Sequence, residues 1–245
     1  MKFGSANVGN LRLGSAQATR AYLGSTLAWD AILALQPALW LSDTGSDPSI
    51  WPDMSGNGRH AIQVSSTNQP AIITGGLNGR QVRRFDGVND YFDHPLAING
   101  GNNTIYVVGK KSGGSSYSYF FEASDAGSPV STFIFARFYG NANWGSYSQG
   151  AGYISSGVEA STFTLMQSRY DGSSIQLRTN GGGLVTSSGA LYGGDGVYRN
   201  GIGAFGPGID PLNGEIAEIL VFPTPHSDTV RQSVEAYLNA KWAIY

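Results

Sequence analysis

From residue 38 onward, hydrophobic and polar positions alternate in many short runs. In 162–169, for example, Phe163 and Leu165 point to one side of an extended chain, and Thr164 and Met166 point to the other. A period of two residues is typical of a β-strand. Such runs predict strands at 38–41, 72–74, 81–85, 104–109, 117–122, 131–137, 162–169, 174–179 and 214–222. Short strands at this spacing, without helices between them, predict a β-sandwich.

The end of the chain has the period of a helix instead. One apolar stripe is formed at helical spacing by Val230, Val234, Tyr237, Leu238 and Trp242. Ser227 is a suitable N-cap, and Asp228 beside it favours the positive end of the helix dipole. We therefore expect an amphipathic helix packed on the sandwich, and a second, short helix over 28–36.

The first thirty residues repeat a phrase of ten residues, with glycines at Gly4, Gly14 and Gly24. Each unit predicts a very short strand that is closed by a Gly-Ser turn. These units have too few apolar residues for a core of their own, so they need a partner surface. The sequence thus predicts an anchoring or assembly segment at 1–36 and one large domain at 37–245. Its predicted anchoring side chains are Leu11, Leu13, Tyr22, Leu23 and Trp29.

Composition narrows the function classes. The 245 residues include no cysteine, which excludes disulfides and thiolate metal sites. Charge is nearly balanced, with 15 Lys and Arg against 17 Asp and Glu, and no basic run indicates nucleic-acid binding. No stretch approaches the roughly 20 apolar residues of a membrane span. The start, 1–5, lacks the apolar region of a secretory signal, so we expect synthesis in a cytoplasm and no membrane insertion.

Three stretches together resemble one known fold family. They are the segment WPDMSGNGRHA at 51–61, the segment RFDGVNDYF at 84–92, and the segment GEIAEILVF at 214–222 with the helix after it. In this order they resemble the concanavalin A-like, laminin G-like jelly rolls. The resemblance implies an all-β jelly-roll β-sandwich, here with a short N-terminal β-repeat segment and a C-terminal amphipathic helix.

The first two motifs also have an architectural interpretation. Asp53 and Asn57 can bind nearby backbone groups, and the glycines of 55–58 can adopt left-handed geometry, so this segment predicts a tight loop between two strands. Phe85 and Tyr91 are expected to fill the core on either side of the next turn.

Many relatives of this fold bind calcium, which makes calcium the candidate metal. Asp86, Asn89 and Asp90, with Asp93 nearby, are clustered oxygen donors. The competing interpretation is that they only form a turn; otherwise we expect no cofactor.

Catalysis is not expected. A retaining glycosidase needs two carboxyls ~5–5.5 Å apart, and Glu215 and Glu218, three residues apart, are expected on opposite faces of their strand. Glu122 and Asp125 have the same spacing at a strand end. The three histidines, His60, His94 and His226, are scattered near turns and are expected to be exposed or half-buried. We therefore predict that the protein is not an enzyme.

Exposed aromatic rings are a second candidate site. Asn143, Trp144, Tyr147 and Tyr139 lie in a region rich in Gly, Ser and Asn, where a Trp is poorly placed for a core strand. Sugars stack on such rings, which makes a cell-surface glycan a candidate ligand. The alternative is that these rings pack long loops or a subunit interface.

The opening repeats loosely resemble the heads of phage tail-fibre and capsid decoration proteins. With the jelly roll, this predicts a non-enzymatic phage virion structural protein, made in the host cytoplasm and located in the virion. Its partners would be other virion proteins and copies of itself, with a trimer favoured. The alternatives are a bacterial carbohydrate-binding or adhesion module and, less favoured, a glycan-active enzyme.

Overall fold

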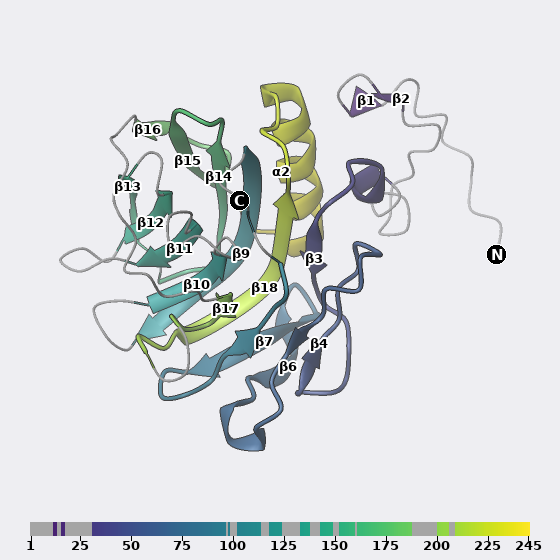
Figure 1. Cartoon of the computed structure of the whole chain (residues 1–245), viewed down its shortest axis with the longest axis vertical. Helices are drawn as coiled ribbons and strands as arrows, with labels where there is room; N and C mark the ends of the chain where they lie inside the picture. Colours follow the sequence, from purple (N-terminus) through teal and green to yellow (C-terminus); the bar gives the residue numbers. More distant parts are fainter. Residues whose placement is uncertain are drawn as a thin grey trace.

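The computed structural model describes residues 12–13, 16–17, 31–96, 98, 102–113, 118–123, 133–137, 143–148, 152–159, 161–187, 200–205 and 209–245. Within this part, the fold is an all-β jelly-roll β-sandwich with a C-terminal helix (Figure 1). Its described helices are too short and too polar to cross a membrane.

The first layer is an antiparallel sheet of eight strands. In spatial order they are β16 (Val185–Ser187), β15 (Ile175–Thr179), β14 (Thr164–Tyr170), β9 (Asn103–Gly113), β18 (Asn213–Phe222), β7 (Arg80–Asp86) and β6 (Ala71–Leu77), with β3 (Leu39–Leu41) beside β18. β7 pairs with the first half of β18 and β3 with the second half, so these two strands share one side of β18. β9 pairs along the whole of its other side.

The second layer consists of two smaller sheets. One contains β10 (Ser118–Ala123), β11 (Phe133–Arg137), β12 (Asn143–Ser148) and β13 (Gly152–Glu159). The other contains β17 (Gly201–Ile202), β8 (Phe92–Asp93), β5 (Ala61–Ile62) and β4 (Ile50–Trp51), with the 3-10 turn η1 (Ser66–Asn68) after β5. Separately, β1 (Arg12–Leu13) and β2 (Ala16–Gln17) pair as a minimal hairpin.

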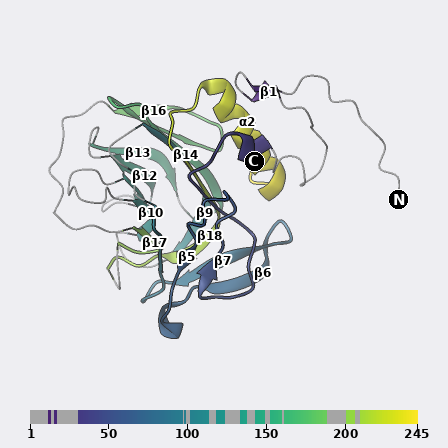
Figure 2. The same ribbon diagram turned by 45° about the vertical axis from the view of Figure 1, so that its right-hand side comes forward.

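Two apolar cores lie on opposite faces of the eight-stranded sheet. The inter-sheet core fills the sandwich and includes Trp51, Phe85, Ile105 and Ile219. The helix-facing core lies between the same sheet and α2 (Asp228–Trp242). Figure 2 shows α2 and the strands β10–β13 on opposite sides of β14, β9 and β18. Both faces of the central strands are therefore buried.

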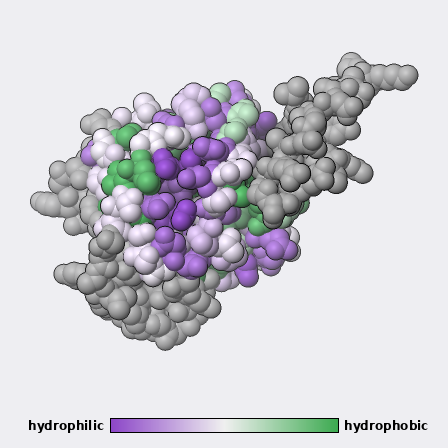
Figure 3. Space-filling view, turned by 90° about the horizontal axis from the view of Figure 1, so that it is seen from above, coloured by the Kyte–Doolittle hydropathy of each residue, from purple (hydrophilic) through white to green (hydrophobic). Residues whose placement is uncertain are grey.

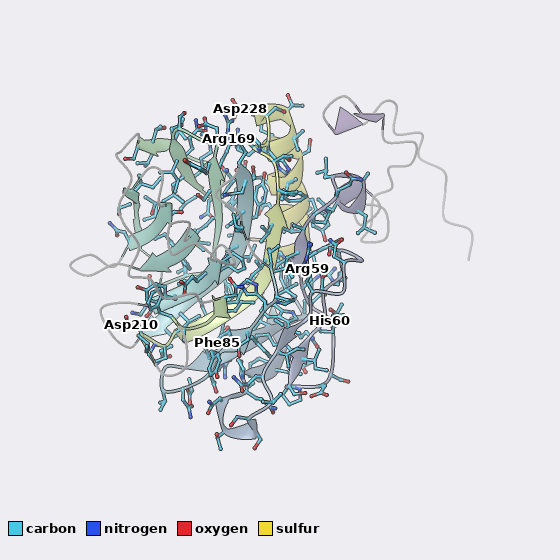
Figure 4. All side chains as sticks on the ribbon, in the orientation of Figure 1. Arg59, His60, Phe85, Arg169, Asp210 and Asp228 are labelled. Atoms are coloured by element: carbon cyan, nitrogen blue, oxygen red, sulfur yellow. The ribbon has the colours of Figure 1, made fainter. Side chains whose placement is uncertain are left out.

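The predicted C-terminal helix is confirmed. The backbone N–H of Val230 donates to Ser227 Oγ, and Ala243 ends the helix in the left-handed conformation. Val234, Leu238 and Trp242 of the predicted stripe are buried. The N-terminal end of α2, where Asp228 lies (Figure 4), belongs to a face on which hydrophilic residues gather in the middle, with small hydrophobic groups to either side (Figure 3).

A buried polar network fastens α2 to the sheet. Glu218 on β18 is 1% exposed and accepts hydrogen bonds from Trp40 Nε1 at 2.6 Å and from Trp242 Nε1 at 2.5 Å. Lys241 Nζ lies 3.0 Å from the same carboxylate and 2.8 Å from Asp43 Oδ1. We call these five residues the Glu218 network; Arg80 pairs with its outer member Asp43 at 2.9 Å.

All nine predicted strands are present, but seven further strands of the described sheets were not predicted. β4, β5, β8 and β17 have two residues each and β16 has three, which is too short to show a period. β12 and β13 are rich in Gly and Ser and show no apolar alternation. Of the short helix predicted over 28–36, residues 31–34 are helical and 28–30 lie outside the described residues.

Candidate ligand-binding cleft

The loop between β4 and β5 is organised by the carboxylate of Asp53. Its Oδ1 accepts from the backbone N–H of Trp40 at 3.0 Å and of Ser55 at 2.9 Å. Its Oδ2 accepts from Ser55 Oγ at 2.8 Å and from the backbone N–H of Arg59 at 2.9 Å. The architectural interpretation of this motif is confirmed, because one carboxylate ties both ends of the loop to the start of β3.

Glycine lets this loop turn sharply enough to project two polar side chains. Gly56 and Gly58 have φ of 86° and 70°, in the left-handed region that other residues rarely adopt. Asn57 Nδ2 donates to Pro37 O at 3.0 Å, and Arg59 Nη1 donates to Ala38 O at 2.7 Å. Figure 4 shows Arg59 beside β3. The loop therefore presents an amide and a guanidinium in defined positions.

A cleft of about 790 Å³ opens beside this loop. It lies between the loop, the segment that leads into β3, the segment before β9 and the end of β18. Its polar lining residues are Gln36, Ser55, Asn57, Arg59, Asn102 and Asn103. Its apolar lining residues are Leu33, Pro37, Ala38, Leu96, Ile98, Val221, Phe222 and Pro223. Cavities of this size and mixed character commonly hold small ligands.

The described lining of the cleft carries a positive charge. Arg59 is the one charged side chain among the described lining residues, which include no Asp, Glu or His. No described carboxylate lies within ion-pair distance of the Arg59 guanidinium. The described part of the cleft therefore combines neutral hydrogen-bonding groups and an apolar wall with a single positive charge.

The predicted aromatic site does not form as expected. Trp144, on β12, is fully buried in the inter-sheet core, with its ring centroid 4.1 Å from that of Phe120. The expectation that Trp144 lies outside the core is wrong, because β12 is an inner strand of its sheet, between β11 and β13, and its indole packs in the inter-sheet core. A sugar cannot stack on this ring without disrupting the core.

The other members of this set are placed in part. Asn143 begins β12 and is half-buried. Tyr147 lies on β12, but its side chain is outside the described residues, as is the whole of Tyr139. Their role in glycan binding stays a prediction. Of the two members whose side chains are described, neither Asn143 nor Trp144 lines the cleft.

The predicted anchoring residues fall largely outside the described part of the chain. Leu11, Tyr22, Leu23 and Trp29 are outside it, and Leu13 is placed on β1 by its backbone alone. The separation of a 1–36 segment from a 37–245 domain therefore stays a prediction.

The calcium candidates form a hydrogen-bonded turn after β7. Asp86 Oδ1 accepts from the backbone N–H groups of Val88 at 2.8 Å and Asn89 at 3.3 Å. Asp90 Oδ2 accepts from the backbone N–H of Asp86 at 3.0 Å, and Asn89 Nδ2 donates to Asn68 Oδ1 at 3.1 Å. Burial, reinforced by the charge of Asp86, raises the pKa of Asp90 to about 6 despite this hydrogen bond. Turn formation thus occupies several of the oxygens that a calcium ion would use.

Among the described residues, no three His, Asp or Glu side chains gather as a metal site would require. A calcium ion on Asp86, Asn89 and Asp90 would need further oxygens from backbone or water, because Ca²⁺ takes six to eight. Calcium binding stays a prediction.

The positions of the Glu215 and Glu218 carboxylates on β18 also differ from expectation. Opposite β9, Glu215 pairs with Lys110 and Glu218 pairs with Val108, and the register shifts by one residue between Ile216 and Glu218. This β-bulge puts both carboxylates on the same face, so the prediction of opposite faces is wrong. Glu218 lies in its network, and Glu215 pairs with Lys110 and with Arg84. Neither lines the cleft; Asp125, the partner expected for Glu122, lies outside the described residues.

Two of the three histidines are buried, contrary to expectation. His94 stacks on Phe121 at 4.9 Å and bonds the backbone oxygen of Glu122 at 2.8 Å. His226 Nδ1 lies 2.9 Å from the hydroxyl of Tyr106. Burial lowers the pKa of each to about 4, with the charge of Arg169 adding to the effect at His226. Both rings are therefore neutral core groups near pH 7.

Comparison with solved structures agrees with the jelly-roll sandwich. Trypanosoma rangeli sialidase in complex with sialic acid superposes with a TM-score of 0.57 at 10% identity, over 87% of this chain and 38% of the sialidase. The botulinum neurotoxin serotype D binding domain gives a TM-score of 0.56 at 13% identity, over 87% of this chain and 52% of the other. The chain thus spans less than two thirds of either neighbour. No family model matches the chain, and no curated protein does.

These likenesses establish the fold alone, because the identities are so low. The neighbours include an enzyme and a binding domain, so the shared sandwich does not separate the two classes. Function has to be argued from the site. The sequence carried a signal for this site, since Asn57 and Arg59 belong to the motif at 51–61, but their side chains are brought to Pro37 and Ala38 only by the folded loop.

Proposed function

We propose that the protein is a non-enzymatic glycan-binding module and that the cleft beside the Asp53 loop holds the sugar. The observation that carries this proposal is the mixed lining. Amide, hydroxyl and guanidinium groups line the cleft together with apolar side chains. A sugar ring has hydroxyls around its edge and C–H groups on its faces, so it matches a cleft that combines a few polar groups with apolar surface.

Binding without hydrolysis is favoured by the positions of the carboxylates. Glycoside hydrolysis commonly uses a pair of carboxyl groups on either side of the scissile bond. The described cleft lining contains none, and Glu215 and Glu218 are held in ion pairs elsewhere. The sialidase named above, whose structure contains sialic acid, adds the weaker support that this fold occurs in a protein that binds a sugar.

Site-directed variants on a glycan array test the proposal. We expect Asn102→Ala and Asn57→Ala to weaken every glycan that the wild-type protein binds. Gln81→Ala is the matched control, because Gln81 also donates its side-chain amide to a backbone oxygen, that of Gly45 at 2.9 Å, but lies outside the cleft. If no glycan binds the wild-type protein, the proposed function is wrong. If binding is lost in Asn143→Ala and kept in Asn102→Ala, the sugar site is on β12 instead.

A virion setting is the finer proposal. It is supported by the repeats at Gly4, Gly14 and Gly24, whose units are too small to fold alone. In this proposal residues 1–30 anchor or trimerise the protein in a tail fibre or capsid decoration, and the sandwich projects outward. Deletion of 1–30 should abolish both the trimer, measured by light scattering, and incorporation into particles, seen by electron microscopy. A truncated protein that keeps both would favour the bacterial adhesion module.

A further inference from the structure

We propose that the cleft selects acidic glycans, with Arg59 pairing with a carboxylate on the sugar. This inference rests on the proposed function, since it assigns a ligand class to the same cleft. It starts from the ion pairs of the described arginines. Arg80, Arg84, Arg169 and Arg231 each lie within 4.0 Å of a carboxylate oxygen. Arg59, Arg83 and Arg178 have no such partner among the described residues. Arg83 is buried and donates to three backbone oxygens, and of these three side chains Arg59 is the one that lines the cleft.

The nearest acidic residue of the loop is already occupied. The two oxygens of Asp53 accept four hydrogen bonds, from Trp40, from Ser55 twice and from the backbone N–H of Arg59. Asp53 therefore positions the backbone of Arg59 and does not neutralise its guanidinium. The positive charge remains in a cleft whose described lining offers no anion.

The guanidinium also has donors left for a ligand. It carries five N–H donors, and the described structure uses one, from Nη1 to Ala38 O at 2.7 Å. That bond restrains the group, and its other donors bond no described residue. A guanidinium matches a carboxylate with two parallel hydrogen bonds, and charge-assisted bonds of this kind are stronger than bonds to neutral hydroxyls. The amides of Asn57 and Asn102 can then bind the sugar hydroxyls.

Matched pairs of oligosaccharides test this inference by calorimetry. Each pair consists of one glycan with its terminal carboxylate free and the same glycan with that carboxylate as a methyl ester; a sulfated analogue forms a third arm. We expect the free acid to bind about 10- to 100-fold more tightly than the ester, because the ester removes the charge that Arg59 meets. The difference in affinity between the acid and the ester should shrink as the salt concentration is raised.

Variants then assign this preference to one side chain. Arg59→Gln should abolish the preference for the acid, because it should weaken binding of the acid far more than binding of the ester, whereas Arg59→Lys should keep part of the preference. Arg178→Gln is the matched control, because Arg178 also donates to a backbone oxygen, that of Gly182 at 3.1 Å, and lies outside the cleft. It should change neither affinity.

Each outcome bears on one proposal. If acid and ester bind the wild-type protein equally, or if Arg59→Gln keeps the preference, the acidic class is wrong and glycan binding stands. If the sulfated sugar binds and the carboxylate does not, the assignment to a carboxylate is also overturned. If nothing binds, the proposed function itself fails. Should Arg59→Gln not fold, the wild-type comparison of acid with ester still decides.

Discussion

Lys241 and Arg59 are basic side chains that make contacts at opposite ends of β3, with Asp43 after it and with Ala38 before it, but their surroundings differ. The Lys241 side chain, on α2, is 9% exposed and lies within 3.0 Å of two carboxylates, on Glu218 and Asp43. Arg59 is half-buried at the cleft and meets no described carboxylate. The charge of Lys241 helps to hold α2 on the sheet, and the charge of Arg59 is the one that we propose for a ligand.

The difference follows from the cost of removing a charge from water. A buried charge needs a counter-charge and hydrogen bonds, because its desolvation is otherwise too costly. A half-exposed charge keeps part of its hydration and can remain unpaired. Buried groups without an ion pair take two other courses here. His94 and His226 stay neutral, and Arg83 donates to three backbone oxygens. Burial and ion pairing thus distinguish the charges that stabilise the fold from the charges that a ligand can reach.

Removing the acid at the centre of the Glu218 network should have the largest effect. We expect Glu218→Ala to lower the free energy of unfolding by about 3–5 kcal/mol, because it leaves Lys241 buried beside fewer carboxylates and two indole N–H groups unbonded. Urea denaturation measures the loss. Glu215→Ala is the control on the same face of β18; it should cost less, because its partner Arg84 is 52% exposed and can turn into water. Equal losses would contradict the comparison.

Acid should destabilise the protein through the two buried histidines. Their pKa of about 4 in the fold lies below the unfolded value of about 6.5, so the unfolded state binds protons first as pH falls. Each histidine should cost about 2 kcal/mol between pH 7 and pH 5. Asp90 opposes this by about 1 kcal/mol, because its raised pKa lets the folded state bind a proton in the same range.

Urea denaturation at pH 7, 6 and 5 checks this dependence. His94→Gln should remove about half of the histidine contribution, even if its stability at pH 7 is lower. A slope against pH that is unchanged in the variant would show that His94 is protonated in the fold.

Asp43 should stabilise the fold above about pH 4 and lose this effect in acid. Burial by itself would raise the pKa of Asp43, but the hydrogen bond and charge of Lys241, with help from Arg80, lower it to about 2. The stabilisation of about 2 kcal/mol is complete above pH 4 and is lost as pH falls toward 2. Denaturation of the wild-type protein and Asp43→Asn across this range should show a difference that shrinks with acid. A constant difference would contradict the lowered pKa.

Calcium binding tests the acidic turn after β7, whose charge is opposite to that of Arg59. Asp86 and Asp90 lie close together without a described basic partner, as Arg59 lies without an acid. If calcium binds there, free calcium at ten times its dissociation constant should add about 1.4 kcal/mol to the free energy of unfolding. Asp86→Asn should remove this gain. A flat calorimetric titration and an unchanged melting temperature in EDTA would dispose of the site.

Arg59→Gln should have the smallest effect on stability. We expect a loss below about 1 kcal/mol, because the change removes one hydrogen bond, to Ala38 O, and no ion pair with a described residue. Thermal unfolding measures it, with Arg178→Gln as the control. A loss as large as that of Glu218→Ala would place Arg59 among the structural charges and remove the basis of the ligand proposal.

The sequence carried enough information to predict the long strands and the helix. Runs such as 104–109 and 214–222 are apolar because both of their faces are buried, and Ser227 marks the start of α2 by its capping side chain. The Asp53 motif was likewise recognisable, because its hydrogen bonds are local. Local rules suffice for features of this kind.

Other features depend on contacts between distant parts of the chain. The bulge in β18 moves Glu218 to the face of Glu215, and no pattern of apolar and polar residues in the strand predicts this bulge. Trp144 is in the core because β11 and β13 enclose its strand, and the cleft joins residues from 33 to 223. The sequence by itself determined the periods, caps and turns, which depend on neighbouring residues. Only the tertiary structure decided which charges are paired, since pairing depends on distances across the whole fold.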